Sequence, residues 1–343
     1  MVLPELADTL RHIGDTGAAA MEPDGWLARE IVDGLERLGG LVTREDIAAY
    51  RVIQREPVRL DYRDVTLHTN PPPSSGGILI AAALAHLAGR PAPADEAAHY
   101  LGVTAAGAAA NALRDEAFAT QLHDPEYVAR LWRRIRDGEP APGAPASRAP
   151  TGTTHVSVMD AEGGVAAVSS SNGAGSGVML PGLGFLLNNM LGEEDLNPGG
   201  FGRIPAGRRM TSMMAPTLVE RGGRPLVVLG SAGSNRLRSA ITQTIVSIVD
   251  GGMGVHDAVA RPRVHPEGDG VDVEGGVPED VCVRLTGAGY RLRRWGGMNL
   301  FFGGVGAVGT IGGDLWGAGD PRRGGAAAGV TSDGEVVDLS TRS

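Results

Sequence analysis

The sequence is poor in the residue types on which several common kinds of site depend. It contains no lysine, so all 31 of its basic residues are arginine. Only 4% of the residues are aromatic, so a buried core must consist mainly of aliphatic side chains. The formal net charge is −9, and no basic stripe or run of aromatic residues is present. This composition argues against a nucleic-acid-binding protein.

A single cysteine, Cys282, excludes an internal disulfide. The surrounding "DVCVRL" alternates in polarity and predicts a β-strand, with Cys282 as a buried structural residue rather than a nucleophile. The eight histidines show no H-x-H or H-E-x-x-H spacing, so the sequence predicts no metal site and no metal cofactor. A phosphate-binding P-loop is excluded because its lysine is missing.

Long apolar runs are also missing. No stretch reaches the roughly 18 residues that a membrane-spanning helix requires. The opening "MVLPELADTL" lacks the basic start and apolar stretch of a signal peptide. The chain as written is therefore predicted to be cytoplasmic, with no membrane partner. A precursor carrying a further N-terminal segment would leave a periplasmic or secreted location open.

The patterning changes character along the chain. Residues 1–132 are mostly helical in pattern, with Thr43 as an N-cap and one helix over about 95–119. Residues 134–152 are rich in Pro, Ala and Gly and predict a flexible linker. From residue 153 onward the pattern is β-rich, with hairpins formed by "THVSVMD" and "VAAVSSS" and by "MAPTLVE" and "RPLVVLG". Separate helical and β blocks favour an α+β layered fold.

Thr153 opens the first of these strands directly after the predicted linker. An internal threonine hydroxyl is a weak nucleophile, but a threonine at a free N-terminus carries its own base, an α-amine with a pKa of about 7.7–8.0. Cleavage between Gly152 and Thr153 would create that terminus. The alternative is that Thr153 and Thr154 simply occupy positions that favour a strand. For His155 we expect a structural role in the strand.

A Gly-Ser loop, "GSAGSNR" at 230–236, connects a predicted strand to a predicted helix. Backbone N–H groups in such a loop can bind an anion. Loops of this composition are also ordinary strand-to-helix connections, so the loop alone leaves both interpretations open.

Six motifs occur in an order that resembles the γ-glutamyltranspeptidase family of N-terminal-nucleophile hydrolases. In chain order they are "PPPSSGGI", "TTHVSVMD", "LLNN", "MAPTLV", "GSAGSNR" and "DPRRGGAAAG". The resemblance covers nearly the whole chain and implies a four-layer αββα sandwich. It implies self-cleavage into 1–152, the C-terminal part of a large subunit, and 153–343, a small subunit. It further implies that the front part of the large subunit, with an arginine for the substrate carboxylate, is missing.

The resemblance implies a chemistry without a cofactor. Thr153 would attack the carbonyl of a γ-glutamyl amide such as glutathione and form an acyl-enzyme. Water or an amino acid or peptide acceptor would then release the acyl group. The implied partners are these small molecules, the two subunits of one precursor and a separate N-terminal segment.

The family's site residues map onto named positions here. Ser171 would support the nucleophile, and Gly233 with Ser234 would supply oxyanion donors from their backbone. Substrate contacts would come from Asn172, Glu193 and Ser212.

Two polar substrate anchors of the family are replaced by Met190 and Met213. Glu193, followed by Glu194 and Asp195, is either an anchor for the substrate amine or part of a solvated acidic turn. The methionines leave a second enzyme open, an acylase or amidohydrolase that acts on a different acyl group. A third alternative is a non-catalytic paralogue or incomplete subunit.

Overall fold

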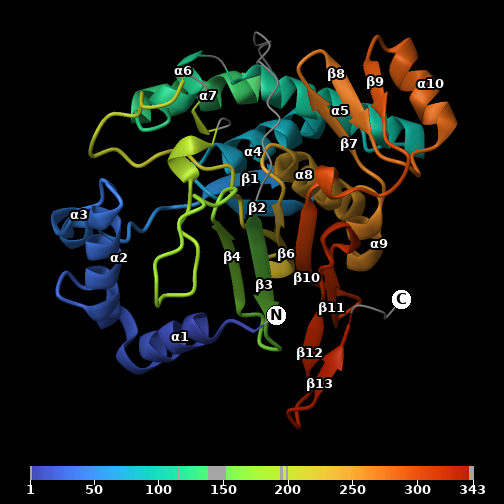
Figure 1. Cartoon of the computed structure of the whole chain (residues 1–343). Coiled ribbons are helices and arrows are strands. Elements are labelled where there is room, and N and C mark those ends of the chain that lie inside the picture. The colour runs from blue at the N-terminus through green and yellow to red at the C-terminus, as the bar shows by residue number, and fades with distance from the viewer. Residues whose placement is uncertain (1, 115, 138–151, 194–195, 198–199, 340–343) are drawn as a thin grey trace. The chain divides into compact units, whose positions relative to one another are not determined.

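A computed structural model describes residues 2–114, 116–137, 152–193, 196–197 and 200–339 (Figure 1). The chain divides into two compact units. The first contains Met1–Arg55 and Asn172–Met190, and the second contains Glu56–Ser171 and Leu191–Ser343. Helices and antiparallel sheets occur together, which confirms the α+β class. The predicted subunit regions, 1–152 and 153–343, stay predictions.

The first unit is a small helical assembly closed by a loop from later in the chain. Its helices are α1 (Pro4–Thr16), η1 (Gly17–Met21), α2 (Trp26–Arg37) and α3 (Arg44–Ala49). Leu180 and Leu183 of the loop pack against Ala20 and Leu27 in its core. The predicted N-cap of α3 is confirmed, because Thr43 and Asp46 form a reciprocal capping box.

The second unit is built on a six-stranded antiparallel sheet with the order β1-β2-β5-β6-β10-β11. Its strands are β1 (Val58–Tyr62), β2 (Val65–Thr69), β5 (Thr217–Arg221), β6 (Arg224–Ala232), β10 (Gly304–Ile311) and β11 (Asp314–Gly319). The last six residues of β6 are buried, so elements cover both faces of this central strand.

Apolar helices cover one face of this sheet. Helices α4 (Ser75–Ala88) and α8 (Arg236–Val249) are buried along nearly their whole length. Helix α5 (Glu96–Ala112) packs on both. Shorter helices surround them: α6 (Glu116–Gln121), α7 (Pro125–Asp137), α9 (Val255–Ala260) and α10 (Glu279–Gly287). A helix that is apolar on most sides is stable only in such a buried position.

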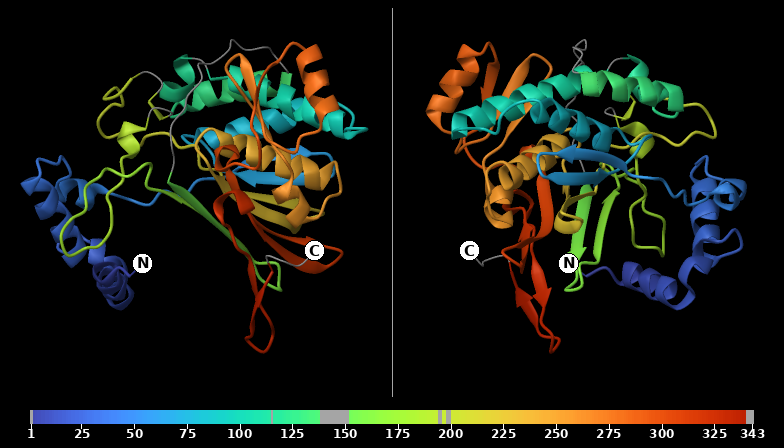
Figure 2. Two further views of the ribbon diagram at one scale, coloured as in Figure 1. Left: turned by 45° about the vertical axis from the view of Figure 1, so that its right-hand side comes forward. Right: turned by 180° about the vertical axis from the view of Figure 1, so that it is seen from behind.

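The opposite face carries the hairpin of β3 (Thr153–Met159) and β4 (Val165–Ser171), which packs on β6 and β10 (Figure 2). The outward face of this hairpin exposes three apolar side chains, Val156, Val158 and Val168, beside the polar Thr154 and Ser170. The described residues of the second unit therefore include a helical layer, a sheet and a hairpin. The four-layer arrangement stays a prediction.

Small elements complete the second unit. They are η4 (Leu300–Phe302), η5 (Pro321–Arg323), a sheet of β7 (Val264–Glu267), β8 (Gly270–Val273) and β9 (Arg291–Arg294), and a hairpin of β12 (Ala328–Val330) and β13 (Val336–Asp338). The short helix η2 (Met190–Gly192) lies at the chain boundary between the two units.

Three local predictions are wrong. Cys282 lies in helix α10 rather than in a strand, although it is buried as expected. The helix expected over 95–119 ends at Ala112, and α6 starts a new one. Helix α7 continues to Asp137, four residues into the expected linker, and the linker residues 138–151 lie outside the described residues.

Candidate active site

The pairing of β3 with β4 brings the two predicted hydroxyls, of Thr153 and Ser171, together. Thr153 opens β3 and pairs in register with Ser171, the last residue of β4. The Thr153 hydroxyl donates a hydrogen bond to the Ser171 hydroxyl at 3.0 Å, and both side chains are half-buried on the inner face. Gly152, the residue before the predicted cleavage point, is exposed. The strand thus presents one hydroxyl, supported by a second, directly after an accessible peptide bond.

His155 anchors the hairpin to the central sheet. Its Nδ1 lies 2.8 Å from the Ser169 hydroxyl, and its Nε2 lies 2.8 Å from the Ser157 hydroxyl. The imidazole ring lies against the backbone of Gly230, where a Cβ atom would overlap it. Burial lowers the pKa of His155 to about 4. A neutral ring with both nitrogens engaged fits the structural role expected from the sequence.

The direction of β3 places Thr153 at the end of the sheet where the Gly-Ser loop begins. His155 lies beside Gly306 of β10. Figure 1 shows β3 and β10 starting at the same end of the sheet, so Thr153, the first residue of β3, lies toward Gly304, the first residue of β10. Gly304 pairs with Ala232, the last residue of β6.

Directly after Ala232, the predicted oxyanion loop makes a sharp turn into α8. Gly233 has a φ of +126° and Ser234 a φ of +52°, which is uncommon for a residue other than glycine. A Cβ atom at position 233 would lie only 2.7 Å from the Cα of Gly303, so glycine is required by close packing too. The loop leads into a helix N-terminus, where the helix dipole favours negative charge.

Arg323 lies against this loop and is not among the site residues expected from the sequence. Its guanidinium is 3.7 Å from the Cβ position of Gly233, and its side chain packs directly on Gly304. Nη2 donates to the carbonyl of Leu300 at 3.1 Å, and Nε has no partner among the described residues. Burial lowers the pKa of Arg323, while Asp320 opposes that shift. The only sequence signal was its place in the "DPRRGG" motif.

A buried ion network holds the segment that carries Arg323. Asp320 accepts hydrogen bonds from Arg263 at 2.7 Å and from the Val305 backbone at 2.8 Å. Arg322 is completely buried and pairs with Glu274 at 2.6 Å. Since each charge is paired at short distance, the network fixes η5 against the start of β10.

Ser212 lies where the "PPPSSGG" loop meets the "TSMM" segment. Its carbonyl accepts hydrogen bonds from the Ser74 hydroxyl at 3.0 Å and the Ser75 hydroxyl at 3.1 Å. Its own hydroxyl accepts from the Met214 backbone at 3.1 Å. Met213 is 7% exposed and contacts the Ser75 hydroxyl through its sulfur, so it acts in packing.

The two remaining predicted substrate residues, Asn172 and Glu193, belong to different units of the chain. Asn172 belongs to the first unit, where its side chain donates to the Leu186 carbonyl at 3.0 Å. Glu193 belongs to the second unit and is only 7% exposed, so the expectation of a solvated turn is wrong at this residue. Glu194 and Asp195 lie outside the described residues.

Clusters of metal ligands and membrane-spanning helices are absent from the described residues. Within the described ranges, no three or more His, Cys, Asp or Glu side chains are grouped so that they could hold a metal ion. Among the helices described, none is both long and apolar enough to cross a membrane.

The known proteins that resemble this chain indicate one family. The chain is 34% identical over 325 residues to the "Acylase ACY 1 proenzyme" of Pseudomonas sp. strain SE83, covering 87% of this chain and 57% of that protein. It is 33% identical over 361 residues to the "Glutathione hydrolase proenzyme" of Pseudomonas aeruginosa, covering 93% and 62%. The chain thus spans about three fifths of the length of these relatives.

A solved structure supports the same fold. The cephalosporin acylase from Bacillus halodurans matches with a TM-score of 0.72 at 24% identity, over 97% of this chain and 62% of that chain. The sequence model of the gamma-glutamyltranspeptidase family matches residues 1–330. These matches confirm the family resemblance that the six sequence motifs indicated. The chain belongs to the gamma-glutamyltranspeptidase family.

Proposed function

We propose that this chain is a hydrolase of the N-terminal-nucleophile type that cleaves itself between Gly152 and Thr153 and then acts on amides through an acyl-enzyme. The observation that carries the proposal is the 3.0 Å contact between the Thr153 and Ser171 hydroxyls at the start of β3. The turn at Gly233 and Ser234, at the end of the sheet where β3 begins, would add backbone N–H groups for the oxyanion.

Maturation would begin at the peptide bond that Thr153 itself forms. The Thr153 hydroxyl attacks the Gly152 carbonyl, the C–N bond breaks, and an ester links the two residues. Water then hydrolyses the ester, which leaves a carboxylate on Gly152 and an α-amine on Thr153. The exposure of Gly152 supports access to this bond.

Turnover would use the new amine as the base. With a pKa of about 7.7–8.0, the free α-amine is partly neutral near pH 7 and accepts the hydroxyl proton. The hydroxyl attacks the substrate carbonyl, and backbone N–H groups of Gly233 and Ser234 stabilise the oxyanion. The leaving amine takes the proton, and water or an amine acceptor releases the acyl group.

The leading substrate class is γ-glutamyl amides such as glutathione, with Ser212, Glu193 and Asn172 as binding residues. A second candidate, an acylase for a different acyl group, is favoured by the burial of Met213 where the family has a polar anchor. An apolar side chain at that position offers no hydrogen bond to an α-carboxylate.

Intact mass spectrometry of the purified chain tests maturation. We expect two fragments, 1–152 and 153–343, and an uncut chain for Thr153→Ala. If the wild-type chain also stays whole, the non-catalytic alternative replaces this proposal.

Substrate class is tested with two chromogenic anilides. Faster hydrolysis of a γ-glutamyl anilide than of a glutaryl anilide supports the leading class, because only the first carries an α-amine. The reverse order supports the acylase alternative.

A further inference from the structure

The proposed oxyanion donors, the N–H groups of Gly233 and Ser234, belong to the backbone, so their direction depends on what holds this loop. Helix α8 begins directly after the loop. Its first two N–H groups hold the loop carbonyls: Arg236 donates to Gly233 at 3.0 Å, and Leu237 donates to Ser234 at 3.2 Å. Whatever fixes the first turn of α8 therefore fixes the loop.

The short helix η4 forms a wall beside this loop. Gly303 follows η4 directly, and its Cα atom would lie only 2.7 Å from a Cβ atom at position 233. Three successive carbonyls of η4 each accept a hydrogen bond from a different arginine. The pairs are Leu300 with Arg323 at 3.1 Å, Phe301 with Arg236 at 3.2 Å and Phe302 with Arg263 at 3.1 Å. Three guanidinium groups thus hold one turn of backbone next to the loop.

Arg236 is the one of these three arginines that lies on the segment carrying the loop. Its Nε donates to the Phe301 carbonyl, and its guanidinium also lies over the ring of the same residue, 4.7 Å from the centroid. A guanidinium can stack on an aromatic ring and donate hydrogen bonds in its own plane. The residue is 6% exposed, so water competes little for either contact. Phe301 therefore holds Arg236 at two points.

Phe301 is itself fixed in place. Its ring stacks on Trp295, with the centroids 4.5 Å apart and an angle of 22° between the planes. Its N–H group donates to the Asn299 side chain at 2.9 Å, and the Asn299 N–H group donates to Glu274 at 2.9 Å. Glu274 pairs with the buried Arg322. This series of contacts joins the buried ion network to the first residue of α8.

On the basis of the function proposed above, we propose that Arg236 is a positioning residue of the oxyanion loop. It ties the first turn of α8 to η4 and so directs the N–H groups of Gly233 and Ser234 toward the carbonyl oxygen under attack. In this role it neither touches the substrate nor exchanges a proton. Because the oxyanion forms only during attack, loss of the contact should lower kcat and leave substrate binding nearly unchanged.

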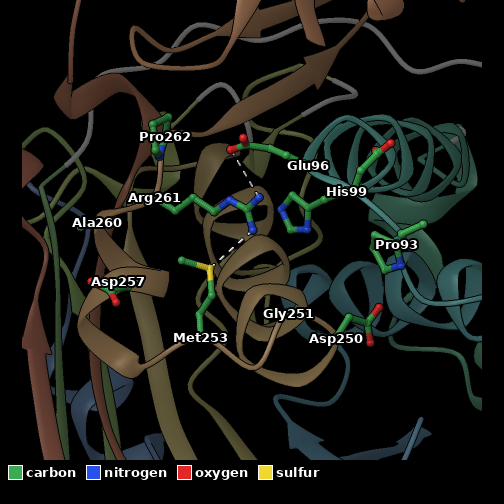
Figure 3. A pocket seen from close by; sticks show the side chains of 12 residues that line it. Pro93, Glu96, His99, Asp250, Gly251, Met253, Asp257, Ala260, Arg261 and Pro262 are labelled. Carbon is green, nitrogen blue, oxygen red and sulfur yellow. Dashed lines mark hydrogen bonds and ion pairs between the residues drawn. The ribbon is translucent and has the colours of Figure 1, made fainter. Parts of the chain in front are cut away.

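Arg261 offers a matched control (Figure 3). It also lies over an aromatic ring, 5.3 Å from the centroid of Tyr100, and it pairs with Glu96 at 3.6 Å. It lines a cavity formed by the start of α5, the turn after α8, and α9. Its side chain also reaches the Ser247 hydroxyl and the Met253 sulfur. These contacts lie outside the oxyanion loop and η4.

Steady-state kinetics of the matured enzyme test the proposal, with whichever anilide the wild type hydrolyses faster. For Arg236→Met we expect kcat to fall about tenfold or more with KM nearly unchanged. Arg236→Lys should show a smaller fall, because an ammonium keeps the charge and a donor but not the planar geometry. Arg261→Met should keep the wild-type kcat. A change confined to KM, or an equal fall of kcat in Arg261→Met, overturns the proposal.

Hydrogen–deuterium exchange of the full chain tests the hold on the loop without turnover. In the Thr153→Ala background, Arg236→Met should speed exchange of the amides of residues 233–237 about tenfold, and Arg261→Met should not. Arg236→Lys and Phe301→Leu should speed it less, and they keep the test decisive if Arg236→Met fails to fold. Unchanged exchange in both of these milder variants overturns the proposal.

The two measurements separate this proposal from the one on which it rests. If the wild type neither cleaves itself nor hydrolyses an anilide, the proposed function fails. The exchange rates then decide by themselves whether Arg236 orders the loop.

Discussion

At the scale of single residues, the candidate site consists of short contacts between groups that are individually unreactive. Thr153 and Ser171 are ordinary hydroxyls until the hairpin register sets them opposite each other. Arg323 is an ordinary cation until the packing of η5 places it behind Gly233. Each of these contacts is open to a single substitution with a close control.

Ser171→Ala removes the partner of the Thr153 hydroxyl. We expect about a tenfold loss in the rate of self-cleavage and in kcat, the effect of one hydrogen bond. The rates are measured by time-resolved intact mass spectrometry and anilide hydrolysis. Ser170→Ala is the control, since that side chain faces outward on the same strand. An equal loss in both variants would contradict a specific role for Ser171.

Arg323→Gln removes the positive charge behind the oxyanion loop while keeping a side chain of similar shape. Because negative charge develops on the carbonyl oxygen during attack, we expect kcat to fall roughly tenfold with KM nearly unchanged. Arg323→Lys should recover most of the rate. A change confined to KM would indicate instead that Arg323 acts in substrate binding.

The burial of the His155 imidazole predicts that the free energy of unfolding depends on pH. The unfolded imidazole binds a proton below about pH 6.5, whereas in the fold burial lowers the His155 pKa to about 4. The folded state therefore loses stability as the pH falls through this window. Between pH 7 and pH 5 we expect His155 to contribute a loss of about 1–2 kcal/mol, allowing for its partial exposure.

Urea denaturation at the two pH values measures this loss. His155→Gln should show a smaller drop in the free energy of unfolding than wild type. His256→Gln, at a side chain that is 46% exposed, should behave like wild type. An unchanged pH dependence in His155→Gln would show that the imidazole does not titrate as its burial implies.

At the scale of elements, the decisive contact is the docking of β3 on the glycines of β6 and β10. Gly230 and Gly306 pair across those strands and lie under the same imidazole, but they tolerate a side chain differently. A Cβ atom at position 230 would overlap the ring, whereas one at position 306 would make an ordinary 3.5 Å contact.

Gly230→Ala should therefore displace the β3–β4 hairpin from the sheet. Gly306→Ala should leave the free energy of unfolding nearly unchanged. For Gly230→Ala we expect a destabilisation of about 1–3 kcal/mol, as for other overpacked sites, and slower self-cleavage. Thermal unfolding and fragment yield are the measurements. Adding His155→Ala to Gly230→Ala should restore part of the stability. Equal effects of the two glycine substitutions would contradict the observed packing.

The type of an element was predictable where the periodic pattern covered many residues or was bounded by a turn. It was not predictable where the pattern covered only a few residues. The hairpin of β3 and β4 was correct because alternation and a turn agreed. The strand expected around Cys282 was wrong because a six-residue apolar pattern fits either period. Glu279 and Asp280 in the first turn and Gly287 at the end were the signals of a helix.

At the scale of the whole molecule, the motif order was enough to identify the family, but the spatial division into two units was not predictable. Residues 172–190 pack against α1 and α2, so contacts such as Thr9 to the Leu183 carbonyl span more than half the chain. Local patterns carry no information on such pairings. For the same reason Arg323 was not predicted as a site residue. Its expected role depends on its contact with Gly233, which is far away in sequence.

The outer face of the β3–β4 hairpin is a whole-molecule feature that can be tested directly. Val156 and Val168 lie opposite each other and are 56% and 61% exposed. Replacing both by threonine should change the free energy of unfolding by less than about 0.5 kcal/mol per site and should lower the binding of an apolar dye. A large loss of stability would show that another surface covers these valines.

Thr153 opens a strand in a sequence without a single lysine, which makes self-cleavage visible to amine chemistry. Within residues 1–343, scission at Gly152 would create the one primary amine that is not at the first residue. The extra label taken up by an acylating dye, relative to an uncut Thr153→Ala chain, would then measure maturation. Labelling across a pH series would titrate the proposed proton acceptor itself, free of the background that lysine side chains create in most proteins.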